Sequence, residues 1–423
     1  MDKKISSVRP LLLLVLTNML GMLLVMIKEH EPDKNMAVLC IVMCVVNIGA
    51  YIVLSLFKLG DVYLFVITSM LATVGVIMQT RIDADGGIRQ MILYLAGSCV
   101  FFAVLAVYGI FHKYFSRFQW VFFGISILLF IITAIFGTEK YGSKNWIIVG
   151  GISIQPSEFI RILFVLSMAA VFTNGRRMDK KEGRFIKEAE RKKRKRLITS
   201  AVIAYINLGF LLLQREWGIS VLFFAVYLSF LYIYGESKLF TALNVLAAIC
   251  GGAFGCMFMS HIKVRVATWL DPFADITGKG YQITQSLFAI ASGGFTGSGI
   301  GCGSPYFIPV VSSDFIFSAI CEEMGVLGAT AVILLYFVLV YRGFKIALSS
   351  TNKFHKAVSV GLSVMLGVQT FIILGGVTKL IPLTGITLPF ISYGGSSMIT
   401  TFSALGILQA VSSMKGEVTD EIK

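Results

Sequence analysis

Long apolar segments alternate with shorter polar ones along most of this chain. A helix that crosses the hydrocarbon core of a bilayer needs about 20 mostly apolar residues. Twelve segments approach that length: 10–27, 36–57, 61–80, 91–112, 119–137, 157–173, 198–213, 218–235, 239–259, 315–341, 357–376 and 389–411. Only Gln214, Arg215 and Glu216 separate 198–213 from 218–235, which indicates either a tight turn between two helices or a break within one. The pattern predicts an all-α integral membrane protein, a polytopic helical bundle of about 10–12 transmembrane helices.

The longest interruption of the apolar pattern runs from residue 260 to residue 314. From Gly278 to Gly328 the chain reads GKGYQITQSLFAIASGGFTGSGIGCGSPYFIPVVSSDFIFSAICEEMGVLG, and it passes into an apolar helix through Asp314. A loop this long in a compact protein is usually functional or disordered. Aromatic residues such as Tyr281 and Phe288 argue against disorder. We therefore expect a large, folded loop outside the bilayer.

Composition supports the membrane class and excludes several kinds of site. Hydrophobic residues make up 56% of the 423 residues and charged residues 14%, with a mean hydropathy of +0.82. The seven cysteines lie mostly inside apolar segments and form no CxxC motif, so we interpret them as small apolar residues and expect neither disulfides nor a cysteine metal site. The first apolar segment has no small-residue cleavage site after it, so we expect no cleavable signal peptide.

The formal net charge of +14 is unevenly distributed and predicts the orientation. Residues 174–197 contain twelve Lys or Arg and four acidic residues. Basic loops favour the cytoplasmic side of a membrane, and with twelve spans the loops at 113–118, 174–197 and 342–356 all fall on the side of the basic N-terminus. Both termini are therefore expected in the cytoplasm. The run RKKRKR at 191–196 could instead contact nucleic acid, but a cytoplasmic loop attracted to anionic lipid headgroups is the better interpretation, and we expect no nucleic-acid partner.

With this orientation, three polar segments face the outside: 141–147 (YGSKNWI), the Gly278–Asp314 loop and 379–397 (KLIPLTGITLPFISYGGSS). They contain most of the Lys, Trp, Asp, Gly and Ser residues that could bind or react with a substrate. Their shared location predicts one site assembled at the outer membrane surface. Five cations lie in the outer loops: Lys144, Lys263, Arg265, Lys279 and Lys379. Each alone could be a solvated or headgroup-level charge. Together they predict an anionic ligand such as a diphosphate.

Asp314 has two interpretations. Asp before an apolar run is an ordinary helix N-cap. It could also be a general base held at the membrane surface, which must lie within hydrogen-bonding distance of the proton it removes. The sequence alone leaves both open.

Several charged or aromatic residues near the predicted site have structural interpretations too. Glu322 and Glu323 lie about two turns into the next helix, where a carboxylate must face the bundle interior or a polar cavity. In QPSEFIR at 155–161, Glu158 and Arg161 are three apart and can pair on one helix face. We assign these four residues to a polar core. Trp146 is either an interfacial anchor or a platform for a sugar ring.

These motifs, in this order, resemble the SEDS family of shape, elongation, division and sporulation proteins. The resemblance covers residues 60–411 and rests on YGSKNWI with QPSEFIR, GKGYQITQSLFAIASGGFTGSGIG, SSDFIFSAICEEMGVLG and IPLTGITLPFISYGGSS. Membership implies a peptidoglycan glycosyltransferase that polymerises lipid II at the outer face of the bacterial cytoplasmic membrane. It implies that Asp314 is the essential acidic residue, here the general base of an inverting transfer, and that undecaprenyl diphosphate leaves.

The resemblance also implies the remaining site residues, partners and domains. Substrate contacts are expected from Lys144, Trp146, Lys263, Arg265, Lys279, Tyr281, Gln282, Gln285, Ser286, Lys379, Ser396 and Ser397. Lipid II, undecaprenyl-linked glycan, membrane lipids and a class B penicillin-binding protein are the expected partners; no cofactor is certain, although a divalent cation is possible in this chemistry. Residues 1–60 would be extra N-terminal segments, 61–411 the core and 412–423 a cytoplasmic tail.

The chain departs from the family pattern at several positions. Ser313 replaces the usual Thr before the Asp, Lys144 and Asn145 replace arginines of the Trp motif, Ile373 replaces an Asn, and Lys379 stands where a small residue is usual. These differences affect the expected diphosphate contacts rather than the expected reaction.

Two other functions were compared with the enzyme. A transporter or flippase of lipid-linked precursors needs charges deep in several helices, and here they are few. A non-catalytic scaffold for a penicillin-binding partner would not need Asp314. The glycosyltransferase is the better interpretation, whereas the choice among division, elongation and sporulation is not encoded in these motifs.

Overall fold

The structure is a computed structural model that describes residues 2–28, 34–140, 143–173 and 184–414. The chain divides into two compact units. The first comprises Met1–Ala106, Val264–Arg342 and Gln369–Lys423, and the second comprises Val107–Lys263 and Gly343–Val368. Part of the predicted basic loop (174–183) and most of the predicted tail (415–423) lie outside the described residues.

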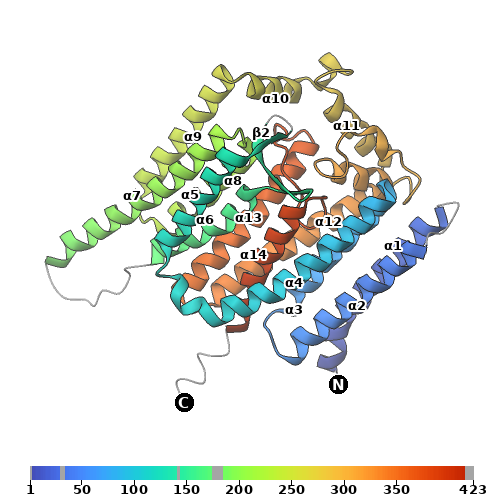
Figure 1. The fold of residues 1–423 in the computed structure, drawn as a ribbon, viewed down its shortest axis with the longest axis horizontal. Coiled ribbons are helices and arrows are strands. Elements are labelled where there is room, and N and C mark those ends of the chain that lie inside the picture. The colour runs from blue at the N-terminus through green and yellow to red at the C-terminus, as the bar shows by residue number, and fades with distance from the viewer. Residues whose placement is uncertain (1, 29–33, 141–142, 174–183, 415–423) are drawn as a thin grey trace. The chain divides into compact units, whose positions relative to one another are not determined.

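The first unit contains both the N-terminal helices and the long polar segment (Figure 1). Its helices are α1 (Asp2–Lys28), α2 (Lys34–Leu56), α3 (Val62–Ile82), α11 (Tyr281–Gly293) and α14 (Gly395–Ser413), with the 3-10 turns η1 (Pro272–Asp275) and η2 (Pro305–Phe307). It also holds most of α4 (Ala84–Phe115) and of α12 (Ile316–Ser349), and the end of α13 (Lys353–Val377). Helices α1 and α2 pack on each other and on α3.

Buried polar side chains attach the N-terminal hairpin α1–α2. In a bilayer the contact between helices depends on packing and polar pairs, because lipid tails are as apolar as the side chains they replace. The Tyr94 hydroxyl donates to Asn47 Oδ1 at 2.5 Å and lies 3.0 Å from Ser69 Oγ, which joins α2, α3 and α4. Within the hairpin, Asn18 Nδ2 donates to the Cys40 carbonyl at 3.3 Å.

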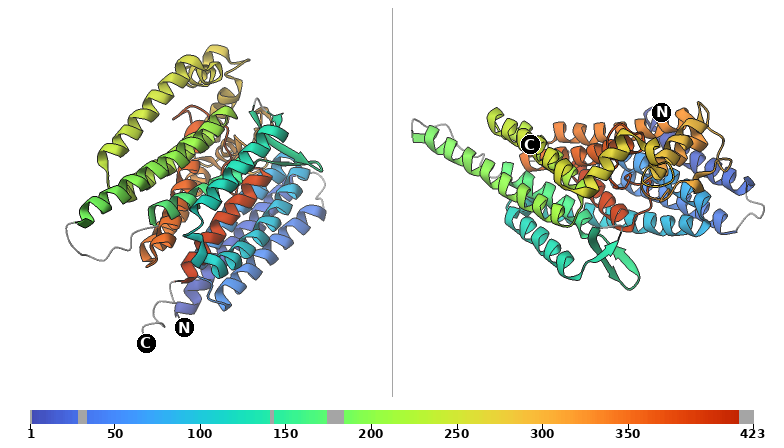
Figure 2. Two further views of the ribbon diagram at one scale, coloured as in Figure 1. Left: turned by 60° about the vertical axis from the view of Figure 1, so that its left-hand side comes forward. Right: turned by 90° about the horizontal axis from the view of Figure 1, so that it is seen from above.

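The second unit contains five whole helices and a small sheet, together with most of α13 and the ends of α4 and α12. The helices are α5 (Gln119–Phe136), α6 (Pro156–Thr173), α7 (Arg184–Leu213), α8 (Trp217–Tyr234) and α9 (Lys238–Phe258). Helix α6 packs against α5, α7 and α8, and α9 contacts α8. Helix α10 (Ser260–Leu270) begins in this unit and continues into the first. Figure 2 shows that the N-terminal end of α7 projects past the neighbouring helices of the unit.

Eleven helices of the described residues are long and apolar enough to cross a membrane, which confirms a polytopic helical membrane protein. Eleven of the twelve predicted segments are among them; the last, 389–411, is not. It corresponds to α14, whose residues are nearly all buried and include Ser396, Thr400 and Gln409. A helix surrounded by protein does not need an apolar surface, so its sequence is less hydrophobic than that of a lipid-facing helix.

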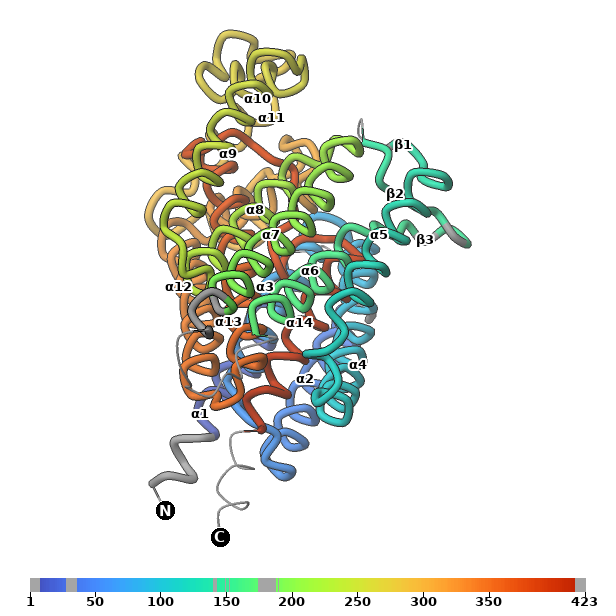
Figure 3. The backbone as a smooth tube through the Cα atoms, turned by 90° about the vertical axis from the view of Figure 1, so that its left-hand side faces the viewer, coloured from blue at the N-terminus to red at the C-terminus, as the bar shows by residue number. Residues whose placement is uncertain are grey.

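The connection that contains the predicted outer motif 141–147 is not irregular but forms a small sheet. Strands β1 (Thr138–Lys140), β2 (Ser143–Val149) and β3 (Ile152–Ile154) form an antiparallel sheet in that order, and Figure 3 shows it beside the ends of α5 and α6. Val149 pairs with Ile152, so Gly150 and Gly151 form a two-residue turn, with φ values of +57° and +82°. Positive φ at both positions is the requirement of a type I′ hairpin turn, and Gly-Gly between β-branched residues is its sequence signal.

Several predicted loops are shorter than expected because the helices continue beyond their apolar parts. Helix α7 includes the basic residues 184–197, and α12 and α13 leave only a short connection in the predicted loop 342–356. The segments 198–213 and 218–235, for which the sequence allowed either two helices or one broken helix, form two separate helices, α7 and α8. Arg215 in the connecting turn has a φ of +60°, which a continuing helix would not contain.

The long polar segment is folded, as predicted, and it pairs with a break in α12. Gly325 has φ 63° and ψ −167° within that helix. The carbonyls of Glu322 and Glu323 accept the amides of Ser298 and Gly299, each at 3.0 Å. On the other side of the break, the amides of Val326 and Leu327 donate to the carbonyls of residues 294 and 295 at 3.0 and 3.2 Å. The glycine-rich loop thus satisfies the backbone groups that the break exposes.

The side chains next to the break complete this attachment. Glu323 is buried and accepts from Arg81 Nε at 3.1 Å and from the Gly301 amide at 3.0 Å. Arg81 also donates to the carbonyls of Gly301 and Gly303, at 3.2 and 3.1 Å. Glu322 Oε1 accepts from the Ser304 amide at 2.8 Å. Both glutamates therefore bind the loop, in agreement with the predicted polar core.

We expect Gly325→Ala to prevent normal folding of the first unit. A Cβ at this position would lie 2.3 Å from the Gly297 amide nitrogen and 2.6 Å from the Phe295 carbonyl oxygen, and the positive φ disfavours any L side chain. The free energy of unfolding should fall by more than about 2 kcal/mol from the backbone conformation alone. Thermal unfolding of the detergent-solubilised protein measures it.

Gly252→Ala is the matched control, because a Cβ at Gly252 in α9 meets nothing within 4 Å. That change should be neutral or stabilising by up to about 1 kcal/mol. Equal melting temperatures for the two variants would show that the break is not required.

Candidate active site

The turn Ser312–Ser313–Asp314 is fixed from two directions before α12 begins. The Ser312 carbonyl accepts from Gln79 Nε2 of α3 at 2.6 Å and from the Tyr393 amide at 2.8 Å. The Ser313 carbonyl accepts from Ser392 Oγ at 2.5 Å. Gln79 and Ser392 are both buried. Because two carbonyls in succession are held, the backbone that carries Asp314 has little freedom.

The segment that holds this turn is itself well supported. The Leu388 amide donates to Ser392 Oγ at 2.9 Å, and Gln90 Nε2 of α4 donates to the Ile391 carbonyl at 3.3 Å. A Cβ at Gly75 of α3 would lie 2.8 Å from the Ile391 carbonyl oxygen, so α3 can approach the segment only because residue 75 is glycine. Residues of the predicted outer segment 379–397 thus hold the turn that carries Asp314.

Asp314 is not the N-cap of α12. The Phe315 carbonyl accepts from the Ser318 and Ala319 amides at 3.0 and 3.4 Å, so the helix starts after residue 315. Among the described residues no helix amide donates to the Asp314 carboxylate. Of the two interpretations left open by the sequence, the structure does not support the cap.

The surroundings of the carboxylate combine desolvation with one cation. Asp314 is half-buried, and burial raises its pKa, while the Ser313 hydroxyl and the Arg265 charge act in the opposite direction. A Cβ at Gly385 would lie 3.5 Å from Asp314 Oδ2 and 3.7 Å from Arg265 Nη2, so both side chains end at the same glycine. Gly385 has a φ of +73°, which favours glycine there. A carboxylate with a raised pKa is a stronger base than an ordinary aspartate.

The first-unit part of α10 carries Arg265 to this position. Arg265 Nη1 donates to the Leu383 carbonyl at 2.9 Å, and Trp269 Nε1, one turn later, donates to the Lys379 carbonyl at 3.1 Å. These two bonds dock α10 on residues 379–383. One terminal nitrogen of Arg265 is thereby used for anchoring, and the other, Nη2, lies near Asp314 at Gly385.

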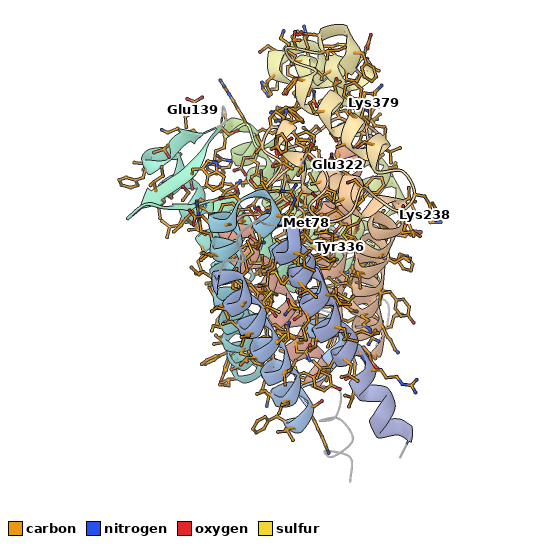
Figure 4. The ribbon with its side chains drawn as sticks, turned by 90° about the vertical axis from the view of Figure 1, so that its right-hand side faces the viewer. Met78, Glu139, Lys238, Glu322, Tyr336 and Lys379 are labelled. Atoms are coloured by element: carbon orange, nitrogen blue, oxygen red, sulfur yellow. The ribbon has the colours of Figure 1, made fainter. Side chains whose placement is uncertain are left out.

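The five predicted cations are distributed over both units. Arg265, Lys279 and Lys379 belong to the first, and Lys144 and Lys263 to the second. Figure 4 shows Lys379 at the end of the first unit where Glu322 lies, with Tyr336 further along α12. Lys279 is exposed on the loop. Lys144 Nζ donates to the Ala134 carbonyl at 2.9 Å, which anchors the sheet to α5.

The other predicted contact residues of the first unit differ in availability. Gln282 is exposed, Gln285 is half-buried, and the Tyr281 hydroxyl donates to the Phe307 carbonyl at 3.3 Å. Ser286 is fully buried, 2.7 Å from Ser318 Oγ and bonded to the Val377 carbonyl at 3.1 Å, so it packs α11 against its neighbours.

The two serines at the start of α14 are buried as well. Ser397 Oγ lies 2.7 Å from Thr387 Oγ1. The backbone carbonyl of Thr387 accepts from Gln369 Nε2 at 2.9 Å. Ser396 and Ser397 thus lie where the final motif enters α14, next to the segment that carries Gly385.

A second polar cluster, missed by the sequence analysis, lies within the second unit and centres on Glu216. Its Oε1 accepts from Gln155 Nε2 and Ser157 Oγ, each at 3.0 Å, and from the Asn145 side-chain amide. Glu216 is buried, and this burial raises its pKa above the ordinary value. The three donors and the Arg161 charge reduce the increase without reversing it. The sequence feature that could have revealed this cluster is the Glu216 carboxylate between the apolar segments 198–213 and 218–235. We interpreted residues 214–216 only as a helix boundary.

The remaining predicted residues of the second unit surround this cluster. Glu158 and Arg161 form a buried ion pair on α6, as their spacing predicted. Trp146 is half-buried on β2, where its carbonyl accepts from Thr138 Oγ1 at 3.1 Å. Asn145, noted as a departure from the family pattern, is one of the three residues that donate to Glu216. Within the described ranges, no three His, Cys, Asp or Glu side chains gather as a metal ion would require.

Comparison with known proteins places this architecture in a family. The family model FtsW/RodA/SpoVE, described as cell cycle protein, matches residues 50–417. The peptidoglycan glycosyltransferase RodA of Mycobacterium tuberculosis is 34% identical over 366 residues, 83% of this chain and 78% of the relative. Stage V sporulation protein E of Bacillus subtilis is 30% identical over 370 residues, 83% of this chain and 96% of the relative.

Solved structures agree on the fold. One from a study of how a peptidoglycan synthase complex coordinates polymerization and crosslinking matches with a TM-score of 0.70 at 25% identity, covering 85% of this chain and 99% of that chain. The crystal structure of RodA from Thermus thermophilus matches with a TM-score of 0.61 at 22% identity, covering 84% and 98%. The chain therefore belongs to the SEDS family of FtsW, RodA and SpoVE, and it is a multi-pass membrane peptidoglycan glycosyltransferase.

Proposed function

We propose that this glycosyltransferase polymerises lipid II with Asp314 as the general base. The observation that carries the proposal is the Asp314 carboxylate, half-buried on a turn whose two preceding carbonyls are held, with Arg265 beside it. Rigid positioning and a raised pKa are what a base needs to remove a hydroxyl proton efficiently at neutral pH.

The proposed reaction is an inverting transfer. The 4-hydroxyl of the acceptor sugar attacks the anomeric carbon of the donor, and its proton passes to Asp314. The bond between that carbon and the diphosphate oxygen breaks, and undecaprenyl diphosphate leaves with the electron pair. Arg265 is the cation best placed to stabilise negative charge near the reacting centre, because it is already anchored through Leu383.

Charge bias supports the orientation of the site. The described basic residues of α7, and those near the end of α12 and the start of α13 (Arg342, Lys345, Lys353 and Lys356), favour the cytoplasm. This bias supports cytoplasmic termini and an outer position for Asp314. Single cysteines at Lys192 and Lys279, both exposed, test this in a cysteine-free background. An impermeant thiol reagent applied outside should label only position 279; labelling of 192 alone would reverse the topology.

The partner is inferred from the solved relative. Its structure comes from work on a synthase complex that polymerises and crosslinks peptidoglycan. We propose that this chain likewise works with a crosslinking enzyme of the class B penicillin-binding type. Residues 1–49 precede the family match, so the α1–α2 hairpin is the part of the chain we assign as an N-terminal addition to the core.

Asp314→Asn should fold normally and lose polymerisation by about 10²–10⁴-fold, the usual contribution of a positioned base. Glycan formation from purified lipid II measures the rate. Asp271→Asn is the control in the same long segment, because Asp271 caps η1 by accepting from the Phe273 amide and Asn caps equally well. Normal polymerisation by the Asp314 variant would exclude the base.

The pH dependence provides a second readout of the same residue. Since burial raises the pKa of Asp314, the rate should fall on acidification at a pH above the ordinary aspartate value of about 4. A raised folded-state pKa also means that ionisation opposes folding. The Asn variant should therefore match or exceed the wild type in melting temperature at neutral pH, and the difference should vanish below about pH 4. A less stable Asn variant at neutral pH would contradict the assigned environment.

Arg265→Gln should reduce polymerisation far more than Lys144→Gln. Arg265 ends beside Asp314, whereas the Lys144 ammonium is already bonded to the Ala134 carbonyl. The Arg265 variant should lose about 10²-fold or more in polymerisation rate, as expected when one donor to a developing charge is removed. The Lys144 variant should lose a few-fold at most. Equal effects of the two variants would reject Arg265 as the key cation.

A further inference from the structure

One face of α7 combines three cations with an apolar track. Arg191, Arg194 and Lys195 line a shallow, open cavity of about 260 Å³ together with Ile198 and Thr199. Positions i, i+3, i+4, i+7 and i+8 lie on one side of a helix, so these five residues form a continuous stripe. The charged part occupies the N-terminal half of the stripe, and the apolar part lies further along the candidate membrane span Glu190–Leu213.

The cations of this stripe are not used to hold the helix in place. Other basic residues of α7 have that role: Lys192 pairs with Glu188 at 2.8 Å, and Arg196 lies 3.9 Å from Glu236 at the end of α8. Among the described residues, neither Arg191, Arg194 nor Lys195 forms an ion pair. Glu188 attracts Arg191 electrostatically, but three like charges within two helical turns still repel one another, and an anion bound among them would reduce that repulsion.

The apolar part of the stripe continues along α7. Ile198, Val202 and Tyr205 follow one another on the same face and are 49%, 44% and 43% exposed. Figure 2 shows this helix running past its neighbours in the unit at the charged end. A row of cations followed by an exposed apolar track has the chemical layout of a phospholipid, with its phosphate at one end and an acyl chain along the other.

We propose that the α7 stripe is a binding site for an anionic phospholipid. The guanidinium groups of Arg191 and Arg194 and the Lys195 ammonium would hold the phosphate by charge-assisted hydrogen bonds. The Thr199 hydroxyl can donate to a headgroup or ester oxygen. One acyl chain would lie over Ile198 and Val202. This site is separate from Asp314 and does not depend on the reaction proposed for it.

Native mass spectrometry of the intact protein tests the proposal. The protein is delipidated in mild detergent and titrated with phosphatidylglycerol or phosphatidylcholine. The variant R191Q/R194Q/K195Q removes the three charges and keeps good helix formers. The control K113Q/K192Q/K353Q removes the same charge from exposed lysines of α4, α7 and α13 that do not line the cavity.

Wild type and control should retain phosphatidylglycerol over phosphatidylcholine. The stripe variant should bind phosphatidylglycerol more weakly by a factor on the order of 100, from about tenfold or less per removed charge. Equal weakening in the control would show that only net charge matters and would overturn the site. Equal retention of the two lipids by the wild type, or displacement by millimolar inorganic phosphate alone, would exclude an anionic phospholipid as the occupant.

Discussion

The structure depends on one constraint, that backbone amides and carbonyls withdrawn from water must be paired. Helix α12 breaks this rule locally at Gly325, and the glycine-rich loop restores it by bonding on both sides of the break. The same constraint explains the turn before α12, where the carbonyls of residues 312 and 313 take partners from α3 and from the final motif. Segments far apart in the sequence are thus joined by hydrogen bonds in which at least one partner is a main-chain group.

This arrangement separates positioning from chemistry. The groups that hold the Asp314 turn, chiefly Gln79 and Ser392, are buried and act on the backbone, while the carboxylate itself keeps few polar partners. A base that made many hydrogen bonds would have a lower pKa and would be a weaker base. Rigid backbone support allows the fold to fix the residue in place without reducing its basicity.

The sequence predicted the membrane class, the helices and the folded state of the 278–328 segment, because apolar length and polar interruption are local signals. It also placed Glu158 with Arg161, a pair set by helical spacing alone. It did not reveal that Glu323 pairs with Arg81 or that Ser392 holds the Asp314 turn, because those contacts join residues more than 70 positions apart. The sheet at 138–154 was readable from Gly150 and Gly151, but the helical expectation for the whole chain concealed it. Glu216 was overlooked because its partners come from other segments, the β2 strand and the start of α6.

The composition of α14 has a consequence for biogenesis. A nascent segment enters the bilayer from the translocon according to its own apolar character, and α14 carries Ser396, Ser397, Thr400, Thr401 and Gln409 on a helix that is buried by its neighbours. Its insertion is therefore favourable only when α3 and the other helices of the first unit are already in the membrane to accept its polar groups. Since α14 follows α12 and the other described helices in the sequence, the residues that complete the Asp314 turn are synthesised after the turn itself. A chain that stalls before that point would lack the residues that hold the Asp314 turn.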